Sequence, residues 1–211
     1  RAGKAMQSHD FDKALVLLDT RVGDYKDALQ KKAQCELEIL KTAEAGDTVT
    51  FGTGRWIVAE TAGEKVLLVR KKPAEEQVPY TDSGKDALWD QSGIRLWLNG
   101  QFYQENFSIY EQEAVLETRV VTPPNSKYGT KSGVETSDRV FLLSDKEADS
   151  YQKLLAVSDN QKPWWLRTSG KSADSAAFVS PAGDVMHYGY AVDSKEIAAR
   201  PAVWVGLSGK P

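Results

Sequence analysis

The sequence predicts an α+β fold in two parts, a short helical segment over residues 1–45 and a mixed α/β domain with antiparallel strands over residues 46–211. Two observations support this division. All six Trp and all eight Pro lie in the second part. The spacing of apolar residues also changes, from a helical period before Gly46 to short apolar runs bounded by glycine turns after it. With 41% hydrophobic and 27% charged residues, the composition is typical of a globular protein.

The helical segment contains an internal repeat. Residues 9–15 (HDFDKAL) recur as residues 23–29 (GDYKDAL), and each copy has an Asp at the position of a helix N-cap, Asp10 and Asp24. We expect two or three short antiparallel helices, the last of which ends near residues 43–46. The pattern resembles tetratricopeptide-type repeats. That resemblance implies a scaffold or spacer with further helical repeats upstream, because one repeat cannot bury its own apolar face.

The second part reads as short strands with a few helices between them. The spacing of Ile94, Trp97 and Phe102 predicts one helix, with a weak point or end at Asn99 and Gly100. Residues 122–137 form an irregular passage that is too long for a simple connection. Strands are predicted at residues 51–58, 65–70, 139–143, 164–168, 176–180, 185–190 and 202–207, the first two as a hairpin.

Two further helices are predicted from their first turns. Ser108–Glu111 and Ser144–Glu147 match the capping box, in which a Ser side chain and a Glu carboxylate satisfy each other's free backbone N–H groups.

Charge and hydropathy exclude two classes of partner. The formal net charge is −3, so there is no broad basic field for general nucleic-acid binding. No apolar run approaches the roughly 18 residues that span a bilayer, so we expect no direct membrane insertion by this segment. The single cysteine, Cys35, permits no internal disulfide, and we interpret it as a small core residue. Because the chain starts at Arg1, we expect it to be a piece of something longer.

Six short motifs in order give the second part a family resemblance. They are FGxGRWIV from Phe51, IRxWLN from Ile94, FY at 102–103 followed by FS at 107–108, DRVFLLS from Asp138, WWLR from Trp164 and RPAVW from Arg200. Together they resemble an uncharacterised bacterial domain of unknown function that is often attached to helical repeats or membrane anchors in surface proteins. More distantly, the layout is similar to the C-type-lectin-like fold shared with formylglycine-generating enzymes.

These resemblances imply several expectations. The Trp56 and Trp204 strands should pair and so join the ends of the domain. The protein should be extracellular or at the cell surface, although the composition is also compatible with a cytoplasmic protein. No catalytic activity carries over, because Cys35 lies outside the matched region. We also expect Trp56, Trp97, Trp164 and Trp204 in the core, and we expect a chain that begins near Ala45 to fold alone.

The sequence predicts a non-catalytic binding or interaction module, with a carbohydrate or a protein as its ligand. Side chains alternate along a strand, so Trp164 should enter the core while Trp165 and Arg167 share the opposite face. There, Trp165 can stack on a sugar ring and Arg167 can bind a carboxylate or hydroxyl. The loops at 122–137 and 169–175 would border this site. Equally, Arg167 can be a structural partner of an acidic residue.

Two other functions stay open. A hydrolase would have to use His187, with Asp184 or Asp193 nearby, although no nucleophile-elbow pattern is present. A purely structural spacer is a further option. No residue is assigned to catalysis, to a metal or to a cofactor. The acidic residues Asp145, Glu147 and Asp149 fit the first turn of the capped helix, where negative charge offsets the helix dipole, or alternatively a calcium site.

Overall fold

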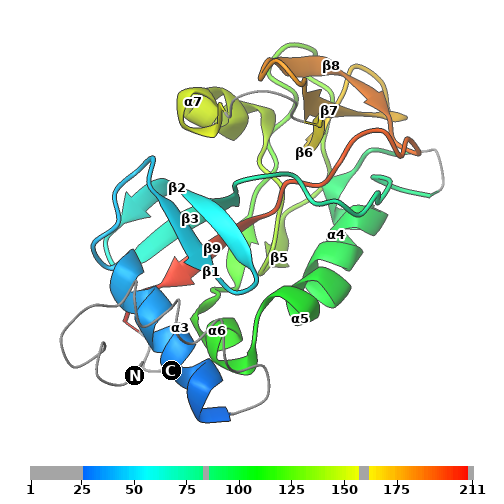
Figure 1. The fold of residues 1–211 in the computed structure, drawn as a ribbon. Helices are drawn as coiled ribbons and strands as arrows, with labels where there is room; N and C mark the ends of the chain where they lie inside the picture. The colour runs from blue at the N-terminus through cyan, green and yellow to red at the C-terminus, as the bar shows by residue number, and fades with distance from the viewer. Residues whose placement is uncertain (1–25, 83–85, 157–161, 209–211) are drawn as a thin grey trace.

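The computed structural model describes residues 26–82, 86–156 and 162–208 and shows an α+β fold with antiparallel sheets. A four-stranded sheet and a three-stranded sheet lie at two ends of the molecule, with a two-stranded ribbon between them (Figure 1). In chain order the elements are α3 (Lys26–Leu40), β1 (Thr48–Phe51), β2 (Gly54–Ala62), β3 (Lys65–Arg70), η1 (Trp89–Gln91), α4 (Gly93–Trp97), η2 (Leu98–Phe102), α5 (Tyr103–Asn106), α6 (Ile109–Ala114), β4 (Thr118–Val120), β5 (Thr136–Asp138), α7 (Asp145–Leu155), β6 (Trp164–Ser169), β7 (Ser175–Val179), β8 (Val185–Ala191) and β9 (Ala202–Gly206).

The large sheet joins the two ends of the domain in the order β1-β2-β3-β9. Strands β2 and β3 form the predicted hairpin, which turns at Gly63 with a φ of 60°. Because β3 pairs locally with β2, only its other edge is available to β9. The Trp56 and Trp204 strands therefore share a sheet, but the expectation that they pair directly is wrong.

Helix α3 packs against the large sheet, beside β1 and α6 (Figure 1). Leu37 and Leu40 on this helix belong to the same hydrophobic cluster as the sheet, and Cys35 is fully buried. Burial raises the pKa of the Cys35 thiol, as expected for a core residue. The first repeat copy, residues 9–15, lies outside the described residues, and the division at residue 45 stays a prediction.

A buried ionic cluster ties α3 to α6. The Lys32 ammonium donates to Glu36 Oε1 (2.5 Å), to Glu111 Oε1 (2.7 Å) and to the Gly52 carbonyl (2.9 Å). Glu36 is fully buried, and this burial raises its pKa. Two carboxylates and one ammonium thus lie between the helical segment and the domain.

The helical run after residue 92 is longer than predicted. Ser92 caps α4, accepting a hydrogen bond from the Arg95 backbone N–H. The helical run does not end at Asn99 and Gly100; the regular α-helix is interrupted there by a π-helical turn, η2, which leads into α5. The Asn99 amide donates to the Val140 carbonyl (2.8 Å), and its oxygen accepts from the Val140 N–H (3.1 Å). Of the two alternatives predicted for Asn99 and Gly100, a weak point or an end, the end is wrong, and the Asn99 side chain fixes a neighbouring segment to the helix.

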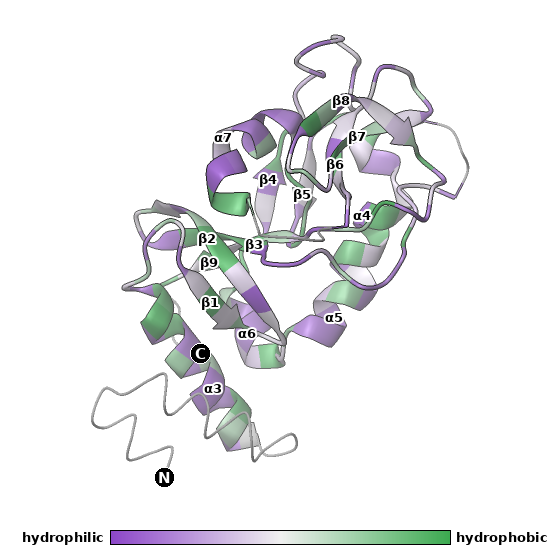
Figure 2. Ribbon diagram, turned by 45° about the horizontal axis from the view of Figure 1, so that its top comes forward, coloured by the Kyte–Doolittle hydropathy of each residue, from purple (hydrophilic) through white to green (hydrophobic). Residues whose placement is uncertain are grey.

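Both predicted capping boxes are present, at Ser108 and at Ser144. Figure 2 shows α7, which follows Ser144, hydrophilic over most of its length and hydrophobic at its end. The predicted strand at 139–143 is wrong, because β5 ends at Asp138 and only Phe141 forms a bridge, to Ala202. Within the described residues, no helix is long and apolar enough to cross a membrane.

The tryptophans are divided between full and partial burial. Trp56 and Trp164 lie in the core as predicted. Trp97 and Trp204 are only half-buried against it, so their assignment to the core is only partly right. The Lys65 ammonium covers the Trp204 ring at 4.5 Å from its centroid, a cation–π contact at the sheet edge.

Candidate functional site

Trp165 lies in the core and not on an exposed face. All six residues of β6 are buried, and the exposed fraction of Trp165 is 0%. Its ring meets the Tyr80 ring edge-on at 5.7 Å, and the Tyr80 hydroxyl donates to the Arg167 carbonyl (2.9 Å). The expectation of an exposed Trp165 and Arg167 face is therefore wrong, since the segment around Tyr80 covers it.

Arg167 is also buried, at 3% exposure, and has an internal partner. Its Nη1 and Nη2 atoms bind the two Glu147 carboxylate oxygens at 2.5 and 3.0 Å. The same two nitrogens donate to the carbonyls of Leu142 (2.7 Å) and Val121 (3.1 Å). Of the two interpretations left open for Arg167, the structure shows the structural one.

We expect Arg167→Met to lower the free energy of unfolding by about 3 kcal/mol at pH 7, because it leaves Glu147 without its cation. Burial raises the pKa of Glu147, but the charge and hydrogen bonds of Arg167 outweigh burial and lower it. The stabilisation is thus complete above the unfolded pKa of about 4.3 and is lost as the pH falls through the lower folded pKa. Urea unfolding measured from pH 7 to pH 3 should show that the difference in unfolding free energy between wild type and variant becomes smaller as the pH falls. A constant difference would contradict this assignment.

The two loops that were predicted to border the site do meet, at a different surface. A shallow groove of about 530 Å³ lies between Tyr128, from the 122–137 passage, and the 169–175 loop. Strand β8 forms its floor through Tyr188 and Tyr190. The aromatic side chains of the groove are therefore tyrosines, and we call it the tyrosine groove.

Alternation along β8 presents the tyrosines outward. Tyr188 and Tyr190 are 50% and 39% exposed. His187, on the opposite face of β8, is 6% exposed. Phe178 on β7 supports both rings edge-on, with centroids at 6.0 and 5.8 Å. Tyr128 is 46% exposed. Three aromatic rings of a small region are thus accessible, and two of them are held by a buried ring.

Two glycines bring the loop close to the strand. Gly189 has a φ of 83°, and a Cβ there would lie 2.8 Å from both the Ala176 carbonyl oxygen and the Gly170 Cα. The backbone N–H of Lys171 donates to the Tyr188 carbonyl (2.9 Å). A side chain at either glycine would separate loop and strand, so the shape of the groove depends on both.

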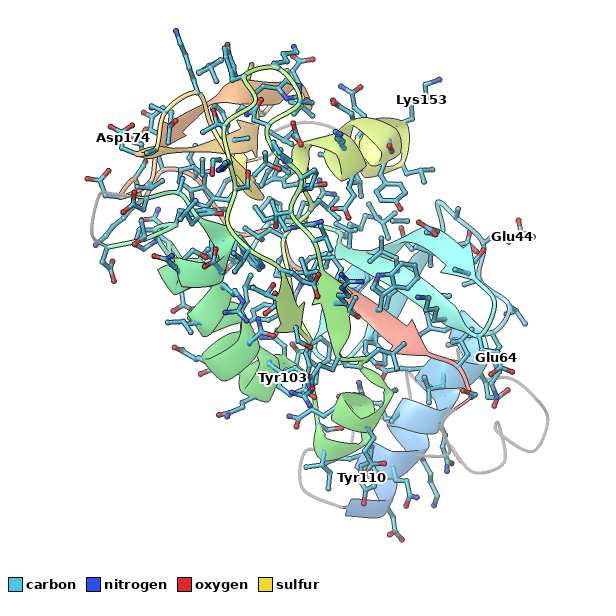
Figure 3. The ribbon with its side chains drawn as sticks, turned by 180° about the vertical axis from the view of Figure 1, so that it is seen from behind. Glu44, Glu64, Tyr103, Tyr110, Lys153 and Asp174 are labelled. Carbon is cyan, nitrogen blue, oxygen red and sulfur yellow. The ribbon has the colours of Figure 1, made fainter. Side chains whose placement is uncertain are left out.

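The rim of the tyrosine groove carries hydrogen-bonding groups. The Ser172 hydroxyl donates to Asp174 Oδ1 (2.6 Å), which orients that carboxylate at the surface. Figure 3 shows Asp174 at the far end of the molecule from Tyr110 on α6. Within the described part of the chain, the Lys171 ammonium has no ion-pair partner and the Tyr188 hydroxyl has no hydrogen-bond partner. These groups are available to a ligand.

Comparison with protein families matches residues 63–207 to the model described as "Domain of unknown function (DUF6273)". This range is more than half of the 211 residues. The chain belongs to the DUF6273 family. Neither the curated proteins nor the solved structures give a significant match. The matched range includes β8 and both loops of the tyrosine groove.

The DUF6273 domain also brings a hydroxyl and a carboxylate to His187. Its Nδ1 lies 3.2 Å from Ser126 Oγ and 3.2 Å from Asp145 Oδ2. The Ser126 hydroxyl donates to the same Asp145 oxygen (2.7 Å). The sequence pointed to Asp184 or Asp193 as the carboxylate near His187, but the structure places Asp145 there.

This arrangement differs from a Ser-His-Asp triad. In a triad the serine bonds one imidazole nitrogen and the carboxylate bonds the other, so that the imidazole can take the serine proton. Here Ser126 and Asp145 both face Nδ1, while Nε2 lies 3.7 Å from Asp149. A Ser126 hydroxyl that donates to Asp145 is not activated as a nucleophile. The geometry favours a structural network.

The acidic residues of α7 are engaged within the DUF6273 domain. Asp145 accepts hydrogen bonds from the Ser126 backbone (2.9 Å) and the Thr168 hydroxyl (3.2 Å). Burial raises the pKa of Asp145, but hydrogen bonds from Ser126, His187 and the backbone outweigh it and lower the pKa. Among the described residues, no group of three or more His, Cys, Asp or Glu side chains is placed to hold a metal ion.

The tyrosines were missed by sequence reasoning, although a signal was present. Residues 187–190 read HYGY, in which two tyrosines alternate with a histidine and a glycine. In a strand this pattern puts both rings on one face.

Proposed function

We propose that this DUF6273 domain is a non-catalytic binding module and that its tyrosine groove binds a short carbohydrate. The observation that supports this most is the exposure of three tyrosine rings in one hollow, above a buried ring that holds two of them. Exposed aromatic residues gathered in a concave surface are typical of binding sites.

The chemistry of the lining fits a sugar. A sugar ring has one face of C–H groups, which packs on an aromatic ring, and an edge of hydroxyls, which need donors and acceptors. The tyrosine rings supply the first, while Lys171, Ser172 and Asp174 supply the second. Tyrosine is also rigid, so little conformational entropy is lost on binding.

The size of the tyrosine groove favours a small ligand over a protein surface. Its volume of about 530 Å³ lies within the range of small-molecule sites, roughly 300–1,000 Å³. A stable protein interface involves about 20–30 residues on each partner, whereas nine residues line this groove. A protein or peptide ligand is therefore the alternative, and the experiment below must distinguish it from a carbohydrate.

Two finer expectations belong to this proposal. We infer a C-type-lectin-like architecture, supported by the sheet that unites β9 with β1–β3 and by the separate three-stranded sheet that forms the floor of the tyrosine groove. We also infer a place outside the cell or at its surface, where a glycan-binding module meets its ligands. A hydrolase around His187 is less well supported, because Ser126 and Asp145 share one imidazole nitrogen.

We expect Tyr188→Ala and Tyr190→Ala each to weaken glycan binding at least tenfold, about 1.4 kcal/mol, because each removes one of the exposed rings. The full chain would first be tested on an array of neutral and acidic oligosaccharides and on a peptide array. The affinity for the strongest glycan would then be measured by calorimetry. The two residues are 50% and 39% exposed, so the melting temperature should move by only a few degrees.

Ile109→Ala is the matched control, because Ile109 is 59% exposed but lies on α6, away from the tyrosine groove. It should leave glycan affinity unchanged. Binding to peptides but not to glycans would assign the site to a protein ligand. Glycan binding that survives both tyrosine variants would place the site elsewhere.

A further inference from the structure

A second cavity, of about 560 Å³, lies where the large sheet meets the helical run after residue 92. This cavity is lined by the first residues of β2, by the end of β3 and the segment that follows it, and by residues of η2 and α5. None of its lining residues belongs to the tyrosine groove. The π-helical turn η2 contributes Phe102, and such turns are frequent at functional sites. We call this space the Arg70 cavity.

Arg70, the last residue of β3, is held in place by neutral groups. Its Nη1 donates to Asn106 Oδ1 (3.0 Å), and its guanidinium lies 5.4 Å from the Trp56 ring centroid and 5.6 Å from that of Phe102. A Cβ on Gly54 would lie 2.5 Å from the guanidinium carbon, so a larger residue there would displace the Arg70 side chain from this position. The guanidinium is therefore preorganised by two rings, an amide and a glycine.

The charge of Arg70 is not neutralised by an internal carboxylate. Among the described residues no Asp or Glu forms an ion pair with it, and its Nε and Nη2 atoms have no hydrogen-bond partner. Arg167, by contrast, has Glu147 across its two Nη atoms. Partial burial lowers the pKa of the Arg70 guanidinium. A half-buried cation with a free Nε–Nη2 fork suits the planar, bidentate geometry of a carboxylate.

The remaining charges of the Arg70 cavity limit the charge of its occupant. Three other cations, Arg55, Lys71 and Lys72, line it together with three carboxylates, Glu75, Glu76 and Glu105. With Arg70 included, the lining carries only one positive charge in excess. A phosphate dianion would be repelled by the three carboxylates, whereas a monoanion placed on Arg70 restores neutrality.

Apolar groups complete the Arg70 cavity. The half-buried Trp97 ring packs on Phe102 at 5.3 Å between centroids, and Pro73 and Ala74 also line the space. The Trp97 indole N–H is itself buried and has no hydrogen-bond partner among the described residues. An occupant with an apolar body and a polar head would match both parts of the lining.

We propose that the Arg70 cavity is a binding site for a small monocarboxylate with an apolar body. The carboxylate lies on the Nε–Nη2 fork of Arg70, and the apolar body lies against Trp97. This site is independent of the tyrosine groove, so either can exist without the other.

The test uses the full chain labelled with ¹⁵N, titrated with hexanoate and, in parallel, with its neutral isostere hexanamide. Hexanoate should produce saturable shifts of the Trp97 indole N–H and the Arg70 Nε–H resonances. Hexanamide at the same concentration should give shifts at least tenfold smaller. The proposal would be overturned if hexanoate gave no saturable shift up to about 50 mM, a concentration far above the Kd of ordinary small ligands.

Three variants test the role of Arg70 directly. Arg70→Gln should weaken hexanoate at least tenfold, and Arg70→Lys should weaken it severalfold because the fork is lost. Arg119→Gln, which removes an arginine 75% exposed at another surface, should change nothing. Equal affinities in the Arg70 and Arg119 variants would contradict the proposal.

A further variant covers the case in which the Arg70 variants do not fold. Glu105 is exposed, so Glu105→Gln should leave folding intact and tighten hexanoate by about twofold. If Glu105→Gln bound hexanoate with unchanged or weaker affinity, the inference from the charges that line the Arg70 cavity would be wrong. Inorganic phosphate that shifts the same resonances at lower concentration than hexanoate would overturn the assignment to a monocarboxylate.

Discussion

A chain that begins at Gly46 is expected to lose the cooperative unfolding of the full chain, contrary to the expectation from the sequence that a chain beginning near Ala45 folds alone. Such a chain lacks Leu37 and Leu40, which are 3% and 1% exposed and lie in the same cluster as the large sheet. It also lacks Lys32, which leaves the buried Glu111 carboxylate without its cation. Each buried leucine contributes about 2–5 kcal/mol, and a typical domain has only about 5–15 kcal/mol in total.

The measurement is urea unfolding followed by tryptophan fluorescence, since all six Trp remain in the shortened chain. Leu37→Ala with Leu40→Ala in the full chain should reproduce most of the loss. Lys41→Ala is the control, because the Lys41 side chain is 44% exposed and forms an ion pair with Glu38 at the surface. A shortened chain that unfolds cooperatively, within about 1 kcal/mol of the full chain, would confirm instead that the boundary at residue 45 separates two folding units.

Trp165→Ala is expected to cost about 3–5 kcal/mol of unfolding free energy. The ring is fully buried, and it packs edge-on against Tyr80, which is fully buried as well. Removing the indole leaves a large cavity beneath β6. The loss should appear as a lower urea midpoint with an unchanged slope.

Tyr188→Ala, in the same small sheet but with an exposed ring, serves as the comparison and should cost no more than about 1 kcal/mol. The two variants thus separate a core aromatic residue from a ligand-binding one. If Trp165→Ala proved as mild as Tyr188→Ala, the packing of the Tyr80 segment over β6 would be wrong.

Local patterns in the sequence predicted most of the elements. The hairpin of β2 and β3 and the two capping boxes each depend on residues within a few positions of one another. The Ser144 box, for example, needs only Ser144 and Glu147 at the right spacing. Such features form wherever the chain can adopt them, so they can be predicted without knowledge of the fold.

Predictions from the sequence were wrong where a segment far away in the chain determines the environment of a residue. Alternation predicted that Trp165 and Arg167 share a face, but the residues that cover that face, Tyr80 and Glu147, are far away in the sequence. The strand predicted at 139–143 failed because the Asn99 side chain takes the Val140 backbone groups instead of a neighbouring strand. Neither contact has a local signature.

The candidate site was predicted in part for the same reason. The passage at 122–137 and the loop at 169–175 were selected by length and composition, and they do line one groove. Which aromatic residues face solvent depends on how β8 packs on β7, a property of the whole sheet. The Arg70 cavity was not predicted at all, because it joins the end of one strand to a helical run some thirty residues later.

The pairing of β3 with β9 has a consequence for how the protein is made. Val69 and Ala202 are partners across these strands, so this ladder closes only when more than a hundred intervening residues have been synthesised. Closing so long a loop is entropically costly, and contacts this distant form slowly. Until then the apolar edge of the β2–β3 hairpin is uncovered on the ribosome, where it is open to mispairing with other nascent strands. The nascent chain is therefore protected from this aggregation only after β9 has been synthesised and has paired with β3.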